Sequence, residues 1–214
     1  MSKILLQLVA SHRASVHTMQ YYSKYDFLLK YIADILKVSF PSTSICILKE
    51  IEEIPDIVID MQRRQCKSDL LLDWLLNITS SGNNNNEKLM VKNQEENNNN
   101  NSNAKLLALC NFDAYSNGLN FVFGQAHRNG KIAAVYLPRL HQEFYGLKEN
   151  DQQLLVLQRV VKEAVHELGH AYGLGHCPIR QCVMHFSNSI SDTDFKAKDF
   201  CQNCERKIFN SSRL

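Results

Sequence analysis

Apolar positions recur along this chain with two different periods, and the period indicates which segments form helices and which form strands. Apolar residues spaced three or four positions apart give a helix one apolar face, whereas a short run of apolar residues favours a buried strand. These patterns predict strands over residues 3–10, 44–49, 105–112, 119–126 and 131–137, and helices over residues 25–38 and 67–78.

The second half of the predicted sheet contains a hairpin and is followed by a long helix. Asn129-Gly130 separates two of the predicted strands, and this dipeptide is typical of a tight hairpin turn. Asn150 or Asp151 can cap a helix that runs on to His170. Because strands and helices alternate, the predicted fold class is α/β, with a mixed sheet, a long helix beneath it and a small C-terminal subdomain.

Residues 81–103 differ in kind from the rest of the chain. They contain eleven Asn among twenty-three residues, and so polar a segment cannot bury enough apolar surface to offset the entropy lost on ordering. We expect a disordered insert tolerated at the surface. A regulatory or adhesive role is the alternative, and no residue pattern supports it.

Composition and charge limit the number of domains and the kinds of partner that the chain can have. A chain of 214 residues with 44% hydrophobic content can form one domain, residues 1–214, and the net charge of +2 indicates neither nucleic acid nor an anionic membrane as a partner. No apolar run is long enough to cross a bilayer. Residues 4–10 are predicted to be a first strand and not a signal core, so we expect an intracellular, cytoplasmic monomer.

The residues from His166 to His176 read HExxHxxGxxH. His166 and His170 are four positions apart, so both imidazoles face the same side of a helix and can reach one ion. Gly173 tolerates a positive φ, which lets the chain leave the helix sharply and return His176 to the same ion. Glu167 stands beside the first histidine, where it can deprotonate a bound water. Three protein ligands with an open fourth position are typical of a catalytic zinc.

Four cysteines lie close together in the sequence after this motif. Cys177 and Cys182 form a C-x4-C pair, and Cys201 and Cys204 form a C-x2-C pair, which suits one tetrahedral zinc held by four thiolates. Two disulfides are the alternative, and the absence of a convincing signal peptide favours zinc. The other cysteines are predicted to be buried or free thiols: Cys46, Cys66 and Cys110.

The combination HExxHxxGxxHC-x4-C-x-M, followed by C-x2-C, resembles the archaemetzincins, a family of metzincin-clan zinc metallopeptidases. Residues 119–126 are similar to the strand that precedes the zinc helix in that family. Residues 61–66 resemble its Arg-x-Gln-Tyr segment, although Cys66 stands where a tyrosine is usual. The resemblance covers most of the chain and is strongest from about residue 104 onward.

The resemblance implies roles for the motif residues. It implies two zinc ions per chain, Glu167 as general base, and Met184 in a tight turn, the Met-turn, under the catalytic zinc. It also implies a mostly parallel sheet whose edge strand, residues 119–126, is antiparallel, and a subdomain over residues 177–214 that contains the Met-turn and the cysteine zinc site. The ligands that it implies are His166, His170 and His176 for the catalytic zinc and Cys177, Cys182, Cys201 and Cys204 for the structural zinc.

The expected function is hydrolysis of peptide bonds by a zinc-activated water with Glu167 as general base. The expected partner is a peptide or protein substrate in extended form. Two alternatives use the same residues. A zinc-scaffolded binding module with little or no turnover would not need Glu167, and a zinc hydrolase of a non-peptide bond would differ only in its substrate.

Overall fold

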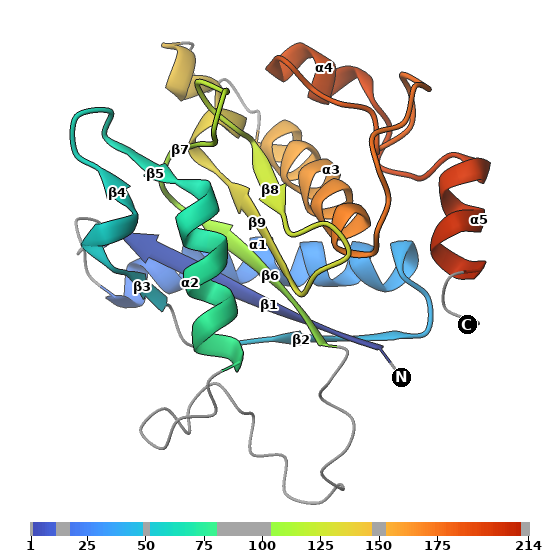
Figure 1. Ribbon diagram of the computed structural model, residues 1–214, viewed down its shortest axis with the longest axis horizontal. Coiled ribbons are helices and arrows are strands. Elements are labelled where there is room, and N and C mark those ends of the chain that lie inside the picture. Colours follow the sequence, from blue (N-terminus) through green and yellow to red (C-terminus); the bar gives the residue numbers. More distant parts are fainter. Residues whose placement is uncertain (1, 12–17, 49–51, 81–103, 147–152, 211–214) are drawn as a thin grey trace, which may run out of the picture.

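The computed structural model describes residues 2–11, 18–48, 52–80, 104–146 and 153–210 (Figure 1). Residues 81–103 and the candidate helix caps Asn150 and Asp151 lie outside this part of the chain. Within it, a six-stranded sheet forms the centre of the molecule and helices cover both of its faces.

The sheet has the strand order β2-β1-β6-β9-β8, and β3 pairs with β1 beyond the end of β2. Every pairing is parallel except that of β8 with β9, which is antiparallel. This confirms the predicted mixed, mostly parallel sheet with an antiparallel edge strand. The strands are β1 (Ser2–Ser11), β2 (Thr43–Ile47), β3 (Glu52–Ile54), β6 (Ala104–Cys110), β8 (Gly124–Ala126) and β9 (Ile132–Tyr136).

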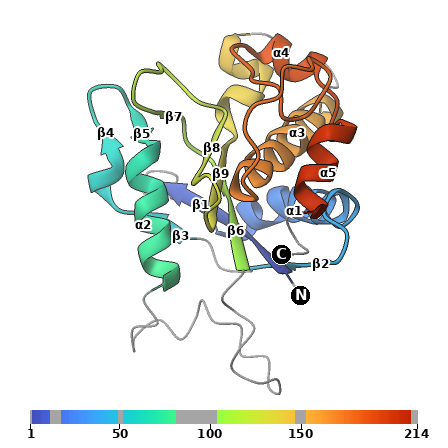
Figure 2. The ribbon, with the colours of Figure 1, turned by 45° about the vertical axis from the view of Figure 1, so that its right-hand side comes forward.

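Helices pack on both faces of this sheet (Figure 2). The helix on the first face is α2 (Ser68–Ser80), and those on the second are α1 (Thr18–Ser39) and α3 (Gln153–Ala171). Two short C-terminal helices, α4 (Ile190–Phe195) and α5 (Gln202–Asn210), lie on the α3 side. No helix in the described part of the chain is both long and apolar enough to span a bilayer.

Short elements complete the fold. A small three-stranded sheet contains β4 (Ile59–Asp60), β5 (Gln65–Lys67) and β7 (Ala114–Tyr115). Single turns of 3-10 helix are η2 (Asp56–Val58), η4 (Pro138–Leu140) and η5 (Gln142–Tyr145). These elements have two to four residues each, too few to produce a periodic pattern, which is why the sequence did not predict them.

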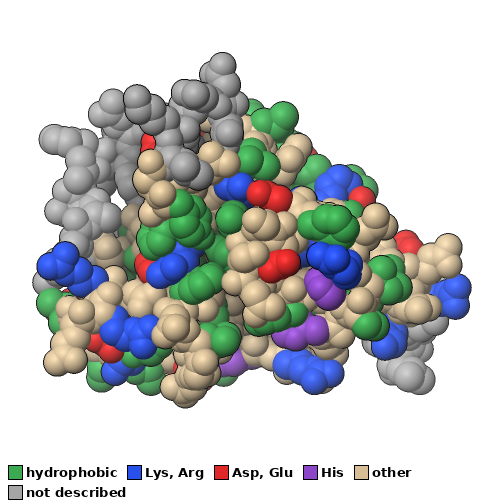
Figure 3. Space-filling view, turned by 90° about the horizontal axis from the view of Figure 1, so that it is seen from above, with side chains coloured by type: hydrophobic (Ala, Val, Ile, Leu, Met, Phe, Trp, Pro, Cys, Tyr) green, Lys and Arg blue, Asp and Glu red, His purple; other side chains and the backbone are tan. Residues whose placement is uncertain are grey.

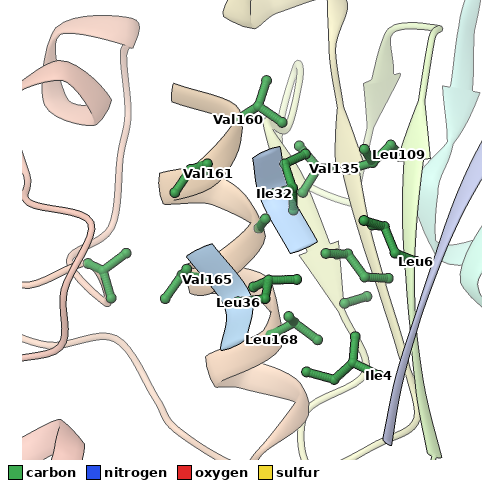
Figure 4. Packing of buried hydrophobic residues seen from close by; sticks show 14 of the residues in the cluster. Ile4, Leu6, Ile32, Leu36, Leu109, Val135, Val160, Val161, Val165 and Leu168 are labelled. Carbon is green, nitrogen blue, oxygen red and sulfur yellow. The ribbon is translucent and has the colours of Figure 1, made fainter. Parts of the chain in front are cut away.

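Alternation along the strands divides the core into two layers, because successive side chains point to opposite faces. In β6, Leu107 and Leu109 pack with α1 and α3, whereas Leu106 and Ala108 pack with α2. All four are buried. The first layer is shown in Figure 4, where residues of α1 and α3 face residues of β1, β6 and β9. This packing on both faces gives α3, which carries the HExxH segment, a rigid support.

The predicted edge strand over residues 119–126 is correct in direction and wrong in extent. Only Gly124–Ala126 pairs with β9, and residues 119–123, hereafter the rim segment, have no regular strand structure. Gly118 has a φ of +80°, which turns the chain just before the rim segment. Val122 then donates its N–H to the carbonyl of Ala114 in the small sheet, at 3.0 Å. The rim segment therefore bridges two sheets and does not extend the edge of one.

Candidate functional site

The three histidines of the motif lie together at the C-terminal end of α3. His166 and His170 project from successive turns of the helix, and His176 returns to them from the loop beyond it. The ring centroids are 4.6 Å apart for His166 and His170 and 4.8 Å apart for His170 and His176. One nitrogen from each ring lies within 4.8 Å of the others. The structure thus brings together the three ligands that the sequence predicts.

The return of His176 depends on the turn that ends α3. Gly173 has a φ of +93°, a region that only glycine enters without a steric cost. Its N–H donates to the carbonyl of His170 at 2.8 Å, and the N–H of Leu174 reaches back to Gly169 at 2.9 Å. These bonds satisfy carbonyls at the helix end and reverse the chain toward the cleft.

The ring nitrogens of these histidines suit a zinc ion. Nδ1 of His166 lies 2.7 Å from the carbonyl oxygen of Val183, and Nδ1 of His170 lies 2.8 Å from that of Leu174. A carbonyl oxygen only accepts, so each Nδ1 carries the proton and each Nε2 keeps a lone pair. The two Nε2 atoms are 3.1 Å apart, close to the separation of about 3.3 Å between two nitrogen ligands of a tetrahedral zinc.

Electrostatics also favours metal ligation by this triad. Burial lowers the pKa of His166 well below its usual value, and burial is again the main reason that the pKa values of His170 and His176 are lowered. The imidazoles are therefore neutral near pH 7, which is the form that binds a metal. The residues present fit the zinc that the motif implies.

Met184 lies directly beneath the zinc helix. Its side chain is fully buried, and its sulfur lies so close to the Cα of Gly169 that a Cβ on that glycine would collide with it. Gly169 stands between the last two turns of α3, immediately before His170. The Met184 thioether therefore packs against the turn of α3 that carries His170, and its role in a Met-turn stays a prediction.

Glu167 lies between α3 and the edge strand. Its side chain is buried, and a Cβ built on Gly124 of β8 would lie 2.5 Å from its Cγ and 2.6 Å from its Oε1. Burial raises the pKa of Glu167 well above its usual range, and the neighbouring carboxyl of Glu163 raises it further. The carboxyl thus sits against the backbone of the edge strand, a contact that only a glycine at position 124 permits.

A cleft of about 580 Å³ opens above these residues. It is lined on one side by the rim segment and β8, and on the other by the three histidines, Glu167 and residues 186–188 after Met184. Figure 3 looks onto this face and shows histidine side chains at the surface with Lys or Arg side chains beside them. The candidate site is therefore open to a ligand from one side.

The four cysteines predicted to share a metal also converge. Their sulfur atoms all lie within 4.8 Å of one another, and the sulfurs of Cys177 and Cys201 are 3.8 Å apart. A tetrahedral zinc with ordinary Zn–S bonds requires a spacing of about 3.8 Å between sulfurs, whereas a disulfide requires about 2.05 Å. All of these thiols are unpaired in the structure. The geometry fits a four-thiolate zinc and not the alternative pair of disulfides.

Hydrogen bonds favour the ionisation of one thiol of the cluster, Cys201, whereas burial raises the pKa values of Cys182 and Cys204. Burial opposes the ionisation of Cys201, but the backbone N–H of Cys204 and the neighbouring thiols outweigh it and lower the pKa of Cys201 to about 7. Outside the cluster, burial raises the pKa of Cys66 to about 12 and that of Cys110 well above its usual value. Cys66 and Cys110 are therefore buried neutral thiols, as the sequence predicted.

The two candidate metal sites are joined by one peptide bond, since His176 and Cys177 are adjacent. The backbone N–H of Cys177 also donates to the carbonyl of Met184 at 2.8 Å. Clamping Cys177 thus fixes both the third histidine and the turn beneath the helix.

A buried ion pair near the cleft was not predicted from the sequence. Nζ of Lys196 lies 2.9 Å from Oε1 of Glu163, which also accepts a hydrogen bond of 3.1 Å from Thr193. All three residues are buried. The pair ties the segment after α4 to the turn of α3 that precedes the histidines. Lys196 and Glu163 are far apart in the sequence, and neither belongs to a motif, so no sequence signal pointed to their contact.

Comparisons with known proteins agree on one family. A family model described as peptidase family M54 matches residues 19–210. The archaemetzincin of Pyrococcus horikoshii is 54% identical over 102 residues, which cover 48% of this chain and 53% of the relative. The chain therefore spans about half the length of the curated relatives it matches.

Two solved structures match over nearly their full length. The crystal structure of archaemetzincin from Methanopyrus kandleri has a TM-score of 0.68 and 27% identity, and the match covers 99% of this chain and 96% of that one. A zinc-dependent peptidase from Methanocorpusculum labreanum has a TM-score of 0.69 and 25% identity, and the match covers 95% of this chain and 99% of that one.

Proposed function

The chain belongs to peptidase family M54, and on that premise we propose that it is a zinc-dependent metallopeptidase with Glu167 as its general base. The observation that carries the proposal is the position of one carboxyl group. Glu167 lies next to three convergent neutral histidines and directly against the edge strand at Gly124. A base, a metal site and a place to hold a peptide thus meet within one cleft.

We assign two zinc ions to the chain, one to each cluster. His166, His170 and His176 would hold the catalytic ion, and the four cysteines of the second cluster would hold the structural one. Zinc on the three imidazoles would supply a Lewis acid that lowers the pKa of a water to about 7 and polarises the scissile carbonyl. The unpaired thiols fit a reducing, intracellular location.

Glu167 moves the protons in this mechanism. Its carboxylate takes a proton from the attacking water and then donates it to the leaving amine, so the same group serves as base and acid. Burial next to Glu163 makes the protonated form more accessible than it is for an exposed carboxyl, because it raises the pKa of Glu167. A carboxyl that can hold the proton between the two steps suits this role.

The open edge of β8 offers a way to hold an extended peptide. The N–H of Tyr136 in β9 donates to the carbonyl of Phe123 at 2.8 Å, and the N–H of His127 donates to the carbonyl of Ile132 in β9 at 3.0 Å. Since bonding alternates along an antiparallel strand, Gly124 presents its backbone N–H and C=O away from β9, toward the cleft. A peptide that pairs there as an added strand would pass over the carboxyl of Glu167.

Gly124→Ala is expected to reduce peptide hydrolysis by ~10²-fold, because the new methyl would displace the Glu167 carboxyl. Zinc content should stay at the wild-type level. Gly146→Ala is the matched control, since a Cβ there meets no heavy atom within 4 Å, Gly146 does not line the cleft, and its positive φ gives the same backbone strain on substitution outside the site. Equal losses of kcat/KM in the two variants would show that the contact with Glu167 is unimportant.

The proposed function is tested by measuring metal content together with cleavage of a peptide library. We expect two zinc equivalents per chain and cleavage that a chelator abolishes and added zinc restores. Two zinc equivalents without any cleavage would favour a zinc-scaffolded binding module. Hydrolysis of an ester or another non-peptide bond alone would favour a different zinc hydrolase.

A further inference from the structure

The segment of residues 61–66 does not line the cleft, yet two of its side chains reach the cleft wall. Nη2 of Arg63 donates to the backbone carbonyl of Asn120 at 3.0 Å, and Nε2 of Gln65 donates to the same oxygen at 3.1 Å. Asn120 belongs to the rim segment, residues 119–123, which lines the cleft. One carbonyl oxygen of the cleft wall is thus held by two side chains from a separate part of the chain.

The two donors are themselves held in place. Nε of Arg63 donates to Oε1 of Gln65 at 3.0 Å, and the guanidinium of Arg63 lies 4.1 Å from the ring centroid of Tyr115. Nε2 of Gln65 donates to Asp113 at 2.9 Å, and Asp113 forms a bidentate pair with Arg139 at 2.7 and 2.8 Å. Gln65 is only 7% exposed. This network fixes the orientation of both donors.

Apart from the packing of Phe121 against the core and Arg139, the rim segment is held mainly by backbone hydrogen bonds on either side of its centre. On one side of Asn120, the N–H of Leu119 donates to the carbonyl of Ser116. On the other side, the N–H of Val122 donates to the carbonyl of Ala114, and the carbonyl of Phe123 accepts from the N–H of Tyr136. No regular ladder passes through residues 119–123. The bonds to the Asn120 carbonyl therefore add polar anchors to the stretch between these backbone bonds.

The rim segment leads directly into the edge strand. Phe123 is followed by Gly124, whose backbone lies against Glu167. Arg139 also stacks on the rim, with its guanidinium 4.4 Å from the ring centroid of Phe121. Any shift of the rim segment would thus change the placement of the edge on which a peptide is held.

We propose that Arg63 and Gln65 are positioning residues, which fix the rim segment and, through it, the substrate-binding edge of the cleft. The proposal rests on the proposed peptidase function and deepens it. Neither side chain touches the histidines or Glu167, so both residues act on substrate binding and not on the chemical step. The function of residues 61–66 would thus be to hold the rim segment in place.

The test compares three variants with the wild-type protein. Arg63→Met keeps the aliphatic stem and removes the donors, Gln65→Leu removes the amide, and Arg64→Met is the matched control at the adjacent, exposed arginine. We expect Arg63→Met and Gln65→Leu each to raise KM by ~5- to 10-fold, the fold-change that accompanies loss of a net hydrogen bond, with kcat within about 2-fold. Zinc content should not change. Arg63→Lys, which retains one donor, should recover part of the lost KM and covers the case in which Arg63→Met fails to fold.

Hydrogen exchange provides a readout that needs no substrate. Amides of residues 119–123 should exchange faster in Arg63→Met and Gln65→Leu than in wild type or Arg64→Met, whereas those of α3 should not. Unchanged rim exchange would overturn the proposal, as would a fall in kcat with KM unaltered. If the wild-type protein cleaves no peptide, the peptidase function fails, and the exchange rates alone still decide whether Arg63 and Gln65 position the rim.

Discussion

Glu167→Ala is expected to abolish peptide hydrolysis almost completely, with kcat reduced by ~10²–10⁴-fold. The variant removes the only carboxyl that lies both beside the three histidines and against the edge strand among the described residues. Metal content should be unchanged, because the histidine nitrogens that would bind zinc are oriented by Val183 and Leu174 and not by Glu167. Steady-state kinetics and metal analysis on the same preparation check both expectations.

Two further variants separate the chemistry of Glu167 from its packing. Glu167→Gln keeps the volume of the side chain beside Gly124 and removes its ability to take a proton, so it should be as impaired as Glu167→Ala. Glu205→Gln, at an exposed position of α5, controls for the loss of one negative charge. Near-normal hydrolysis by Glu167→Gln would remove this residue from the mechanism.

Cys201→Ser or Cys204→Ser is expected to remove one zinc equivalent and much of the stability of the protein at the same time. Binding of structural zinc contributes on the order of 10 kcal/mol to the folded state of small zinc domains. The melting temperature should therefore fall steeply. Hydrolysis should fall too, since Cys177 is bonded to the neighbouring residue His176 and to Met184. Metal analysis and thermal melting report the two losses separately.

Cys46→Ser is the matched control for this pair of variants. Cys46 is a half-buried, unpaired thiol in β2 and is not part of the cysteine cluster. Its replacement should leave both zinc equivalents and the melting temperature close to their wild-type values. The structural-zinc assignment would be contradicted if Cys201→Ser kept two zinc equivalents and melted like Cys46→Ser.

The sequence predicted the elements whose patterns are long or whose residues are chemically distinctive. Apolar spacing predicted α2, β1, β2, β6 and β9 to within two residues, because each buries a continuous face, but it began α1 seven residues late and did not predict β3. The histidine and cysteine spacings predicted two clusters, and both are present. The catalytic and ligand roles of these residues stay predictions until metal and activity are measured.

The contacts that the sequence did not predict join residues far apart in the chain. Arg63 and Gln65 reach Asn120 across 57 and 55 positions, and nothing in their local pattern indicates that partner. The rim segment was predicted as strand because its residues are apolar, whereas the small sheet competes for Val122. Strand propensity is a property of a segment taken alone, whereas the conformation of the rim segment depends on its contact with the small sheet.

Because His176 and Cys177 are adjacent, the order of synthesis determines when the third histidine can be held in place by the cysteine cluster. A chain leaves the ribosome from its N-terminus, so the whole HExxHxxGxxH motif emerges before Cys201, which follows Cys177 by 24 positions. The loop that presents His176 is also held by later residues, since Val183 donates its N–H to Asp199 and Ala197 to Gln181. A nascent chain thus carries the complete motif before it can fasten its third histidine. In the proposed peptidase, hydrolysis would therefore arise only after release of the C-terminal cysteines.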